Sequence, residues 1–300
     1  MTPTRAHGSL GNNIKVHFAG TDFDHRCITS LELANVHYRL YTVFPAIIAK
    51  KPGDDFRDKS GVVQRQEKVF KHVIMDSGLF TLMFGGKKGV KQTRQTLTEW
   101  QDKTFEFVKQ NRLKNTCVEI DCQKLLGVED AWFFRQRMRD TLPNRQINVF
   151  HYEDGRKGLD RLIEFSDYIA LSIPEIRIVH PKSFREDTYA LASYIKNKKP
   201  EIDIHLLGCT DKKMLMQNRF CTTADSSSWT GVYRFANIQG NSAYNLKQEV
   251  LEDAEKRWRA AAGEKEWNEL TPIAKRRAVW ELISAEVNRG VYEKYAGNQE

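Results

Sequence analysis

Short apolar runs recur along the chain up to residue 225, and most of them end at a polar residue or a glycine. Runs that are rich in β-branched and aromatic side chains predict buried strands. Between most of these runs, apolar residues return at the spacing of an amphipathic helix, as Leu97, Trp100, Phe105 and Val108 do. The eight predicted strands span 14–20, 40–44, 72–75, 116–120, 147–150, 168–171, 202–207 and 220–224.

Strands that alternate with helices predict an α/β protein with a parallel sheet. Eight such units favour a closed (β/α)8 TIM-type barrel, and an open doubly wound sheet is the main alternative. No glycine-rich dinucleotide fingerprint follows the first predicted strand, which argues against the open sheet. We therefore predict a barrel over residues 1–240, with a C-terminal helical extension over residues 241–300 packed on it.

Several local predictions complete this picture. A helix is expected over 30–37, after a polar loop with the sequence TDFDHRC, and an outlying strand is expected over 232–238. Two strongly charged segments, 246–261 and 272–295, carry apolar stripes that predict helices. Pro45 is expected to end the second strand.

The charge of the chain bears on its partners. With 47 Lys and Arg against 39 Asp and Glu, the 300 residues carry a formal net charge of +8. This balance favours a polyanionic partner, although many basic enzymes never bind nucleic acid. The polar N-terminus lacks a secretory apolar core, and no apolar run approaches the roughly 20 residues that span a bilayer. We expect a cytoplasmic protein, in the host cytoplasm if a phage encodes it.

The five cysteines, at positions 27, 117, 122, 209 and 221, form no CxxC pair. This spacing argues against a zinc ribbon and against a disulfide framework. We expect reduced, buried thiols.

Polar residues at the ends of the predicted strands are the candidate site. Because parallel strands of a barrel all finish at one end, these side chains are expected to converge there. Each alone could be a helix cap or a satisfied core residue, as Asp76 could be before the helix that starts near Leu79. Buried carboxylates without partners are costly, so three of them in equivalent positions favour chemistry. The strand-end residues are Asp76, Asp121, His151, Ser172, Cys209 and Asp225.

Three reaction types suit such a cluster. Metal-assisted hydrolysis would use several histidines and carboxylates, but His17 stands alone in VHF where metal-dependent barrel hydrolases carry HxH. Glycosyl transfer would use one carboxylate as nucleophile and another as proton donor and acceptor, without a cofactor. Proton abstraction with a cofactor would need a phosphate loop or a cofactor lysine, and neither is evident.

Four motifs resemble those of tRNA-guanine transglycosylases, in the order and at the strand ends that this family uses. DSGLF (76–80) is similar to the family's DSGGFQ-type motif, and VEIDC (118–122) resembles the strand with its base-reading aspartate. HLLGCTDKK (205–213) resembles a late barrel strand, and TTADSSSW (222–229) falls where the nucleophilic aspartate lies. The match spans about residues 14–235. It is closest to the DpdA-type enzymes of phages and bacteria, which place 7-deazaguanine bases in DNA.

The resemblance implies roles for individual residues. Asp225 is the expected nucleophile at the sugar C1′, and Asp76 is the expected general acid and base. Asp121 is expected to read the purine edge, and Phe80 to stack on the base unless it only packs in the core. The remaining expected base-binding residues are Ser77, His151, Ser172 and Gly208.

The sequence also departs from the family. The tRNA enzymes hold structural zinc with CxCxxC and a distant histidine, but no cysteine follows Cys221 here, so no zinc and no other cofactor is expected. Because that region belongs to the tRNA-binding appendage, DNA is the expected acceptor and tRNA the alternative. His151-Tyr152 and Ala170-Leu171-Ser172 replace the family's pocket segments, so base preference does not carry over. The expected co-substrate is a free 7-deazaguanine base of the preQ0 type.

A nucleotide within a duplex would have to be flipped out, or be single-stranded already, to reach such a pocket. Four cations follow the Asp76 turn and are expected to contact phosphates, unless they form an ordinary solvated loop: Lys87, Lys88, Lys91 and Arg94. A second basic surface is formed by Arg257, Arg259, Lys275, Arg276 and Arg277. Two other functions stay open, a metal-dependent hydrolase using Asp76, Asp121 and His151, and a non-catalytic nucleic-acid-binding barrel.

Overall fold

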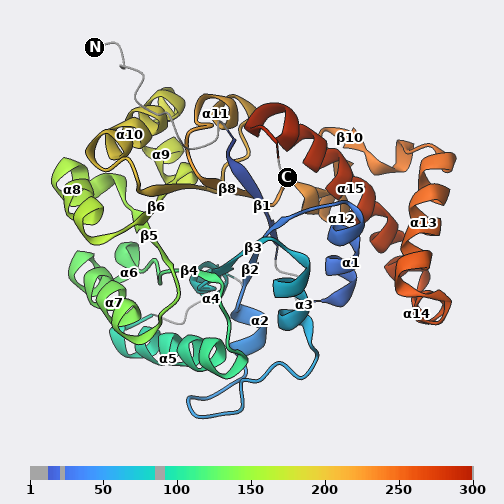
Figure 1. The fold of residues 1–300 in the computed structure, drawn as a ribbon, viewed down its shortest axis with the longest axis horizontal. Helices are drawn as coiled ribbons and strands as arrows, with labels where there is room; N and C mark the ends of the chain where they lie inside the picture. The colour runs from blue at the N-terminus through green and yellow to red at the C-terminus, as the bar shows by residue number, and fades with distance from the viewer. Residues whose placement is uncertain (1–12, 21–23, 85–91, 299–300) are drawn as a thin grey trace.

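The computed structural model describes residues 13–20, 24–84 and 92–298, apart from the side chains of Phe80, Met83 and Phe84. Eight parallel strands follow one another around a closed ring in the order in which they occur in the sequence. Figure 1 shows this ring at the centre, with helices around its outside. The predicted (β/α)8 barrel is confirmed, and the open sheet is wrong, because β1 pairs with β8.

Every strand pairs in parallel with both of its neighbours. His17 in β1 pairs with Asp225 in β8, and Thr42 in β2 pairs with Asp76 in β3. Because all eight strands run in one direction, their carboxyl ends meet at a single rim, which we call the mouth. The strands are β1 (Lys15–Gly20), β2 (Tyr38–Thr42), β3 (His72–Asp76), β4 (Thr116–Val118), β5 (Gln146–Phe150), β6 (Tyr168–Ser172), β7 (Asp203–Leu207) and β8 (Thr223–Ser226).

Helices connect the strands and cover the barrel. Those before β8 are α1 (His25–Leu33), α2 (Phe44–Ile47), α3 (Val62–Val69), α4 (Leu79–Phe84), α5 (Arg94–Asn111), α6 (Gln123–Leu126), α7 (Val128–Thr141), α8 (Gly155–Phe165), α9 (Ile173–Val179), α10 (Phe184–Lys198) and α11 (Lys212–Gln217). Those after β8 are α12 (Gly231–Phe235), α13 (Gln248–Ala262), α14 (Glu264–Glu269) and α15 (Pro272–Ala296). Short 3-10 turns lie at Tyr152–Asp154, Ser228–Thr230 and Ala243–Asn245, and β9 (Asn237–Ile238) pairs with β10 (Asn241–Ser242). Among the described residues, no helix has the length and apolar character of a membrane span.

Alternation along the strands separates two apolar layers. Ile74 of β3 belongs to a small cluster inside the ring, whereas Val73 and Met75 pack in the larger cluster between strands and helices. Since successive residues of a strand face opposite sides, Asp76 faces the inside with Ile74. In β8, Ala224 packs outside, so that Asp225 faces the inside as well.

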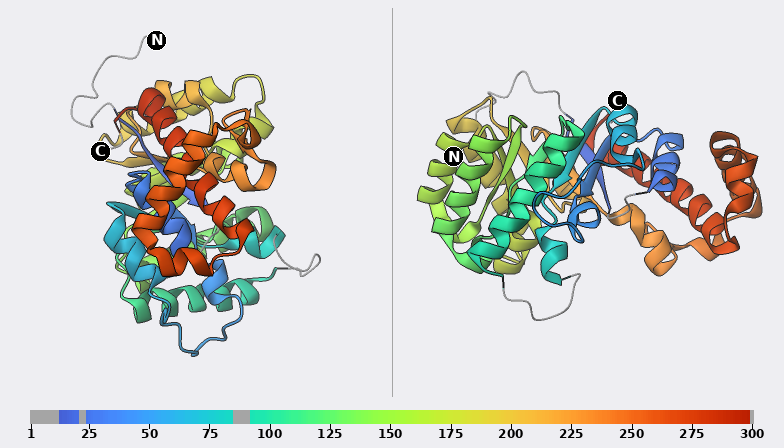
Figure 2. Two further views of the ribbon diagram at one scale, coloured as in Figure 1. Left: turned by 90° about the vertical axis from the view of Figure 1, so that its right-hand side faces the viewer. Right: turned by 90° about the horizontal axis from the view of Figure 1, so that it is seen from below.

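The C-terminal helices lie beside the first and last parts of the barrel. α15 contacts α1, α11 and α13, and it fills the place in the outer ring after β8 (Figure 1). α13 and α14 extend to one side of the barrel (Figure 2). Ser284 in α15 donates a hydrogen bond to the Trp229 carbonyl at 2.8 Å, which ties this helix to the segment after β8. Both predicted C-terminal helices are confirmed, and the division of the chain at residue 240 stays a prediction.

The first helix begins earlier than the sequence pattern predicts. It spans His25–Leu33 instead of 30–37, because the side chain of Asp24 accepts a hydrogen bond from the Arg26 amide at 2.6 Å and caps the helix. Asn35, with a φ of +53°, marks the turn after it. The polar character of TDFDHRC concealed this helix start.

Two strand predictions near turns are also wrong. β2 ends at Thr42 rather than at residue 44, because Pro45 suits the first turn of a helix and Phe44 already begins α2. The expected strand over 232–238 is the helix α12 up to Phe235, followed by Ala236 with a φ of +47°. Its last two residues form the strand β9, which pairs with β10 outside the barrel because the closed ring has no free edge.

A buried ion pair joins Glu119, the residue after β4, to Arg135 in α7. Glu119, at 1% exposure, accepts hydrogen bonds from Arg135 Nε at 2.8 Å and Nη2 at 2.9 Å. Asn148 Nδ2 donates to the same carboxylate at 2.6 Å, and Arg135 also donates to the Val149 carbonyl. Both charges are therefore satisfied by fixed partners.

Replacing Arg135 with leucine is expected to destabilise the fold by about 3–5 kcal/mol, because it leaves a buried carboxylate without its cation. Urea unfolding measures this loss. The double variant Glu119→Leu/Arg135→Leu is expected to be more stable than Arg135→Leu alone. If Arg135→Leu lowers the free energy of unfolding no more than Arg57→Ala does at an exposed site, Arg135 does not compensate a buried charge on Glu119.

Candidate active site

Three carboxylates from different strands surround the mouth. Asp76 ends β3, Asp121 follows β4 and Asp225 lies in β8. Burial and, after it, the negative charges of Asp225 and Asp121 raise the pKa of Asp76 to about 6. The three acids that the sequence placed at strand ends therefore share one electrostatic environment.

The turn after β3 fixes the Asp76 side chain. Its Oδ1 accepts a hydrogen bond from the Gly78 amide at 2.8 Å, as a capping residue would. Gly78 has a φ of +75°, and a Cβ atom there would lie 3.0 Å from Thr42 Oγ1. The buried Ser77 accepts a hydrogen bond at its carbonyl from Trp100 Nε1, at 2.8 Å. Asp76 is thus an oriented carboxyl group that keeps a proton closer to neutral pH than an ordinary aspartate, which suits a general acid and base.

Asp225 is the most enclosed of the three acids. The residue is 8% exposed, and its Oδ1 accepts a hydrogen bond from the Gly208 amide at 2.7 Å. The Nε2 atom of His205 lies 3.2 Å from the same oxygen. Among the described residues, Oδ2 has no hydrogen-bonding partner, so one carboxylate oxygen is fixed while the other is free to act.

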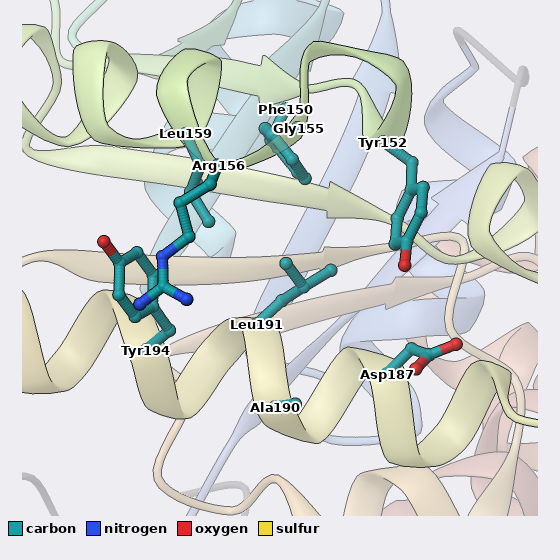
Figure 3. A pocket seen from close by; sticks show the side chains of 9 residues that line it. All are labelled: Phe150, Tyr152, Gly155, Arg156, Leu159, Asp187, Ala190, Leu191 and Tyr194. Carbon is teal, nitrogen blue, oxygen red and sulfur yellow. The ribbon is translucent and has the colours of Figure 1, made fainter.

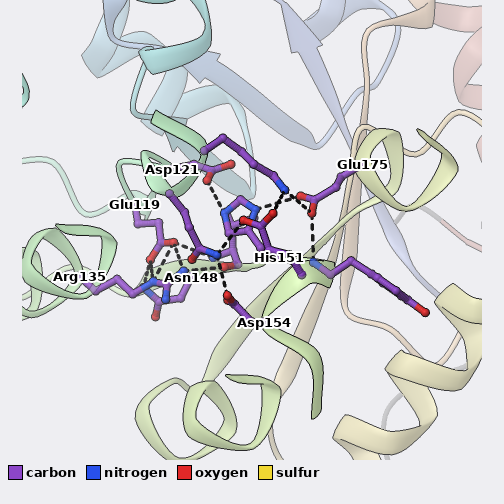
Figure 4. Close-up of polar contacts among 12 residues, drawn as sticks. Glu119, Asp121, Arg135, Asn148, His151, Asp154 and Glu175 are labelled. Atoms are coloured by element: carbon purple, nitrogen blue, oxygen red, sulfur yellow. Dashed lines mark hydrogen bonds and ion pairs between the residues drawn. The ribbon is translucent and has the colours of Figure 1, made fainter. Parts of the chain in front are cut away.

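Asp121 is held by an imidazole between two carboxylates (Figure 4). His151 Nε2 lies 2.7 Å from Asp121 Oδ1, and its Nδ1 lies 2.9 Å from Glu175 Oε2. Burial lowers the pKa of His151, but the hydrogen bonds and charges of Asp121 and Glu175 outweigh it and raise the pKa to about 10. The imidazole is therefore a cation at neutral pH, and it orients an Asp121 side chain that is 34% exposed.

Glu175 lies in the first turn of α9, directly after β6. The Tyr152 amide donates to its Oε1 at 3.1 Å, and Lys124 Nζ lies 3.3 Å from the same atom. Despite burial, the hydrogen bond and charge of His151 keep the pKa of Glu175 below its ordinary value. Ser172, half-buried, immediately precedes this helix at the mouth.

Of the other predicted site residues, some lie outside the described residues, and Arg94 and Cys209 have partners or surroundings of their own. Lys87, Lys88 and Lys91 lie outside the described residues, as does the Phe80 side chain. Arg94 begins α5, where it lies 3.3 Å from an Asp130 oxygen and above the ring of Phe133 at 4.0 Å. Cys209 is fully buried, and burial raises the pKa of its thiol to about 12.

The second basic surface is largely neutralised by neighbouring acids. Lys275 and Arg276 lie over the rings of Trp267 and Trp280. The other three arginines pair with carboxylates: Arg257 with Glu286, Arg259 with Glu264, and Arg277 with Glu281.

Sequence reasoning missed Glu175 and His205. Glu175 follows a strand end by three residues and stands in the first turn of a helix that opens with Ile173 and Pro174, which is a readable signal. His205 alternates with the outward-packing Ile204 and Leu206, so its inward position could have been inferred from the period of the strand.

A largely apolar pocket of about 280 Å³ lies between α8 and α10, outside the barrel (Figure 3). Leu159, Leu191 and Tyr194 line it, and none of the three mouth carboxylates does. Among the described residues, no group of three or more His, Cys, Asp or Glu side chains is arranged to hold a metal ion.

Comparisons with known proteins add the following. No protein-family model matches the sequence, and no curated protein matches it. Among solved structures, the YdjI aldolase from Escherichia coli K12 is similar with a TM-score of 0.47 and 11% identity, over 96% of this chain and 94% of that chain. The aldolase QR15 is similar with a TM-score of 0.40 and 12% identity, over 73% of this chain and 92% of that chain. At these scores the likeness carries no argument about function.

The imidazole of His151 bridges the carboxylates of Asp121 and Glu175, and this bridge predicts how the stability of the fold depends on pH. The folded imidazole keeps its proton up to about pH 10, whereas the unfolded one releases it near its ordinary value of about 6.5. The contribution of His151 to the free energy of unfolding is therefore fully present below about pH 6.5. It is lost as the pH rises toward 10, by at most about 1.4 kcal/mol per pH unit. Urea unfolding of wild type and His151→Gln between pH 6 and pH 10 measures the difference.

Glu175→Gln is the matched control for this experiment, because it keeps the shape of the bridge and removes one of the two charges. It is expected to fall between wild type and His151→Gln. Parallel stability curves for all three proteins would show that His151 is not a bridged cation.

Proposed function

We propose that the protein is a base-exchange transglycosylase that replaces guanine in DNA with a 7-deazaguanine derivative through a covalent aspartyl-glycosyl intermediate. The observation that supports this most strongly is the division of labour among three carboxylates at one mouth. Asp225 is fixed through one oxygen, Asp76 has a pKa of about 6, and Asp121 is oriented by a cation. The four motifs of the sequence supply the same three acids in the same order.

Asp225 is the proposed nucleophile. A sugar carbon with oxocarbenium character is stabilised by an anion close by, and a carboxylate can then form a covalent bond with it. Asp225 would bond to C1′ of the target nucleotide while the C1′–N9 bond breaks. The electron pair of the broken bond leaves with guanine.

Asp76 is the proposed proton donor and acceptor. In its protonated form it would give its proton to the departing guanine, and it would then take the N9 proton of the incoming base. The N9 atom of that base attacks C1′ and releases the Asp225 carboxylate, so that the enzyme returns to its starting state. General acid–base catalysis of this kind typically contributes about 10²–10⁴-fold to the rate.

Asp121 is the proposed reader of the base. One of its oxygens faces His151, and the carboxylate is exposed enough to accept hydrogen bonds from the N–H and amino groups of a guanine edge. A site built in this way rejects bases that lack those donors, because its buried polar groups would be left unpaired. Ser77, Ser172 and Gly208, near the same rim, would contact the base, and Phe80 would stack on it.

DNA is the proposed acceptor. The net charge of +8 favours a polyanion, and Lys87, Lys88, Lys91 and Arg94 follow α4, the short helix after the Asp76 turn, in the sequence. A target base in a duplex would be flipped out to reach the mouth. No cysteine after Cys221 is present to form the zinc region of the tRNA enzymes, which makes tRNA the second choice.

Incubation with labelled guanine, and then with a labelled 7-deazaguanine base, tests the reaction directly. DNA is expected to become labelled, and Asp225→Asn is expected to reduce labelling by at least about 10³-fold, because the amide cannot form the covalent bond. Asp160→Asn, at a partly exposed site on α8 that is not part of the mouth, is the matched control and should label as wild type. If tRNA alone becomes labelled, the acceptor is tRNA and not DNA. If neither polymer becomes labelled, the proposal is refuted.

The pKa of Asp76 predicts the pH dependence of the first half-reaction. Because the protonated form donates to guanine, release of guanine from a single turnover should slow as the pH rises above about 6, the value that burial sets for this group. The slope should approach tenfold per pH unit, and Asp76→Asn should lower the rate by about 10²–10⁴-fold below about pH 6 and by less as the pH rises, because the wild-type acid is then increasingly ionised. A rate independent of pH between 5 and 9 would exclude Asp76 as the acid.

Loss of folding would not explain a lower rate in Asp76→Asn. A buried carboxyl with a raised pKa contributes stability at low pH and loses it as the pH passes through about 6. A neutral asparagine avoids that loss, so Asp76→Asn should be at least as stable as wild type at pH 8.

A further inference from the structure

A chain of hydrogen bonds leads from Asp225 into the interior of the barrel. His205 of β7 is fully buried, with Nε2 lying 3.2 Å from Asp225 Oδ1 and Nδ1 lying 2.8 Å from Thr223 Oγ1. The Thr223 hydroxyl in turn contacts the hydroxyl of Tyr168, which is also buried. Four polar groups from β6, β7 and β8 thus form one connected row beneath the mouth.

We propose that His205 is a positioning residue which, together with the Gly208 amide, fixes Asp225 Oδ1 and thereby selects Oδ2 as the atom that attacks the sugar. This role rests on the proposed transglycosylase function. It adds the residue that orients the nucleophile and the identity of the attacking atom.

The arrangement of protons supports this role. An ionised carboxylate only accepts hydrogen bonds, so His205 must carry its proton on Nε2 to bond with Asp225. In the neutral imidazole, Nδ1 then accepts from the Thr223 hydroxyl, whose oxygen accepts from Tyr168. Burial raises the pKa of Tyr168 well above its ordinary value, so that the phenol keeps its proton and donates it. Every group in the row has a partner in this state.

The charged form of His205 fits less well. An imidazolium would donate from Nδ1 to Thr223 Oγ1, and one of the two hydroxyl protons, that of Thr223 or that of Tyr168, would then have no acceptor within the row. Burial lowers the pKa of the neighbouring His17, whose ring lies 6.5 Å from that of His205, well below its ordinary value. Satisfied polar rows of this kind are rigid.

Both donors to Asp225 come from the same short segment, HLLG. His205 faces the barrel interior from β7, and Gly208 begins the turn after it with a φ of +66°. A Cβ atom at Gly208 would lie 3.2 Å from Pro174 of α9, so the close approach of its amide depends on glycine. A carboxylate held at one oxygen by two N–H groups has a fixed orientation, and its second oxygen has no partner among the described residues. Misplacing a reacting atom by about 1 Å can cost about 10²-fold in rate.

Two substitutions of equal polarity test the proposal. In His205→Gln the amide nitrogen can reach the position of Nε2 and donate to Asp225, whereas in His205→Asn the shorter amide reaches Thr223 but not Asp225. The rate of covalent adduct formation in a single turnover is expected to fall about 10²-fold in His205→Asn. His205→Gln is expected to retain the rate to within about tenfold, and the KM values for DNA and free base should stay within about twofold of wild type in both.

The outcomes separate the two proposals. If wild type forms no adduct with either polymer, the transglycosylase function and with it this role of His205 are refuted. If wild type forms the adduct and the two variants behave alike, whether active or inactive, His205 does not orient the nucleophile. If His205→Asn fails to fold, Thr223→Val, which removes the donor to Nδ1, should lower the adduct rate about tenfold without changing KM, and an unchanged rate would overturn the proposal.

Discussion

A closed ring of parallel strands has only one end at which every strand finishes, and this geometry gathers the polar groups of the protein. β3 and β8 are far apart in the sequence, yet Asp76 and Asp225 face the same interior because β1 and β2 join their strands around the ring. The helices on the outside bury the other face of each strand, so the mouth brings together carboxylates that are both oriented and reachable.

The electrostatics of the mouth follow from how each charge is compensated. Glu119, one residue beyond β4, is neutralised by Arg135, so its role is structural. His151 is matched by two carboxylates, and Asp225 receives two N–H groups at one oxygen. In the part of the chain that the structure describes, the Asp76 carboxyl accepts a hydrogen bond only from the Gly78 amide, and it faces two like charges, so a proton completes its compensation. The group with the least compensation is therefore the one suited to transfer protons.

The residues that orient the acids come from elements other than those that carry them. Glu175 reaches His151 from α9, and His205 reaches Asp225 from β7. Pro174 of α9 also limits the space at Gly208, so this short helix touches the supports of both Asp121 and Asp225. The function that we propose thus depends on the packing of β6, α9 and β7 as much as on the three acids. The contacts of Glu175 with His151 and of His205 with Asp225 orient the acids, which three carboxylates at strand ends alone would not ensure.

The amino-acid sequence by itself determined the barrel and the three acids. Strand and helix periods are local properties, and a carboxylate directly after an apolar run is visible without any partner. The partners of those acids were decided by tertiary structure, because the His151–Glu175 and His205–Asp225 contacts join residues that no local period relates. The same holds for α12, where ring closure removed the edge that a strand would need, and for α1, whose start depends on a single capping side chain at Asp24. Periodicity specifies which face a residue takes, whereas only packing specifies which residue lies opposite it.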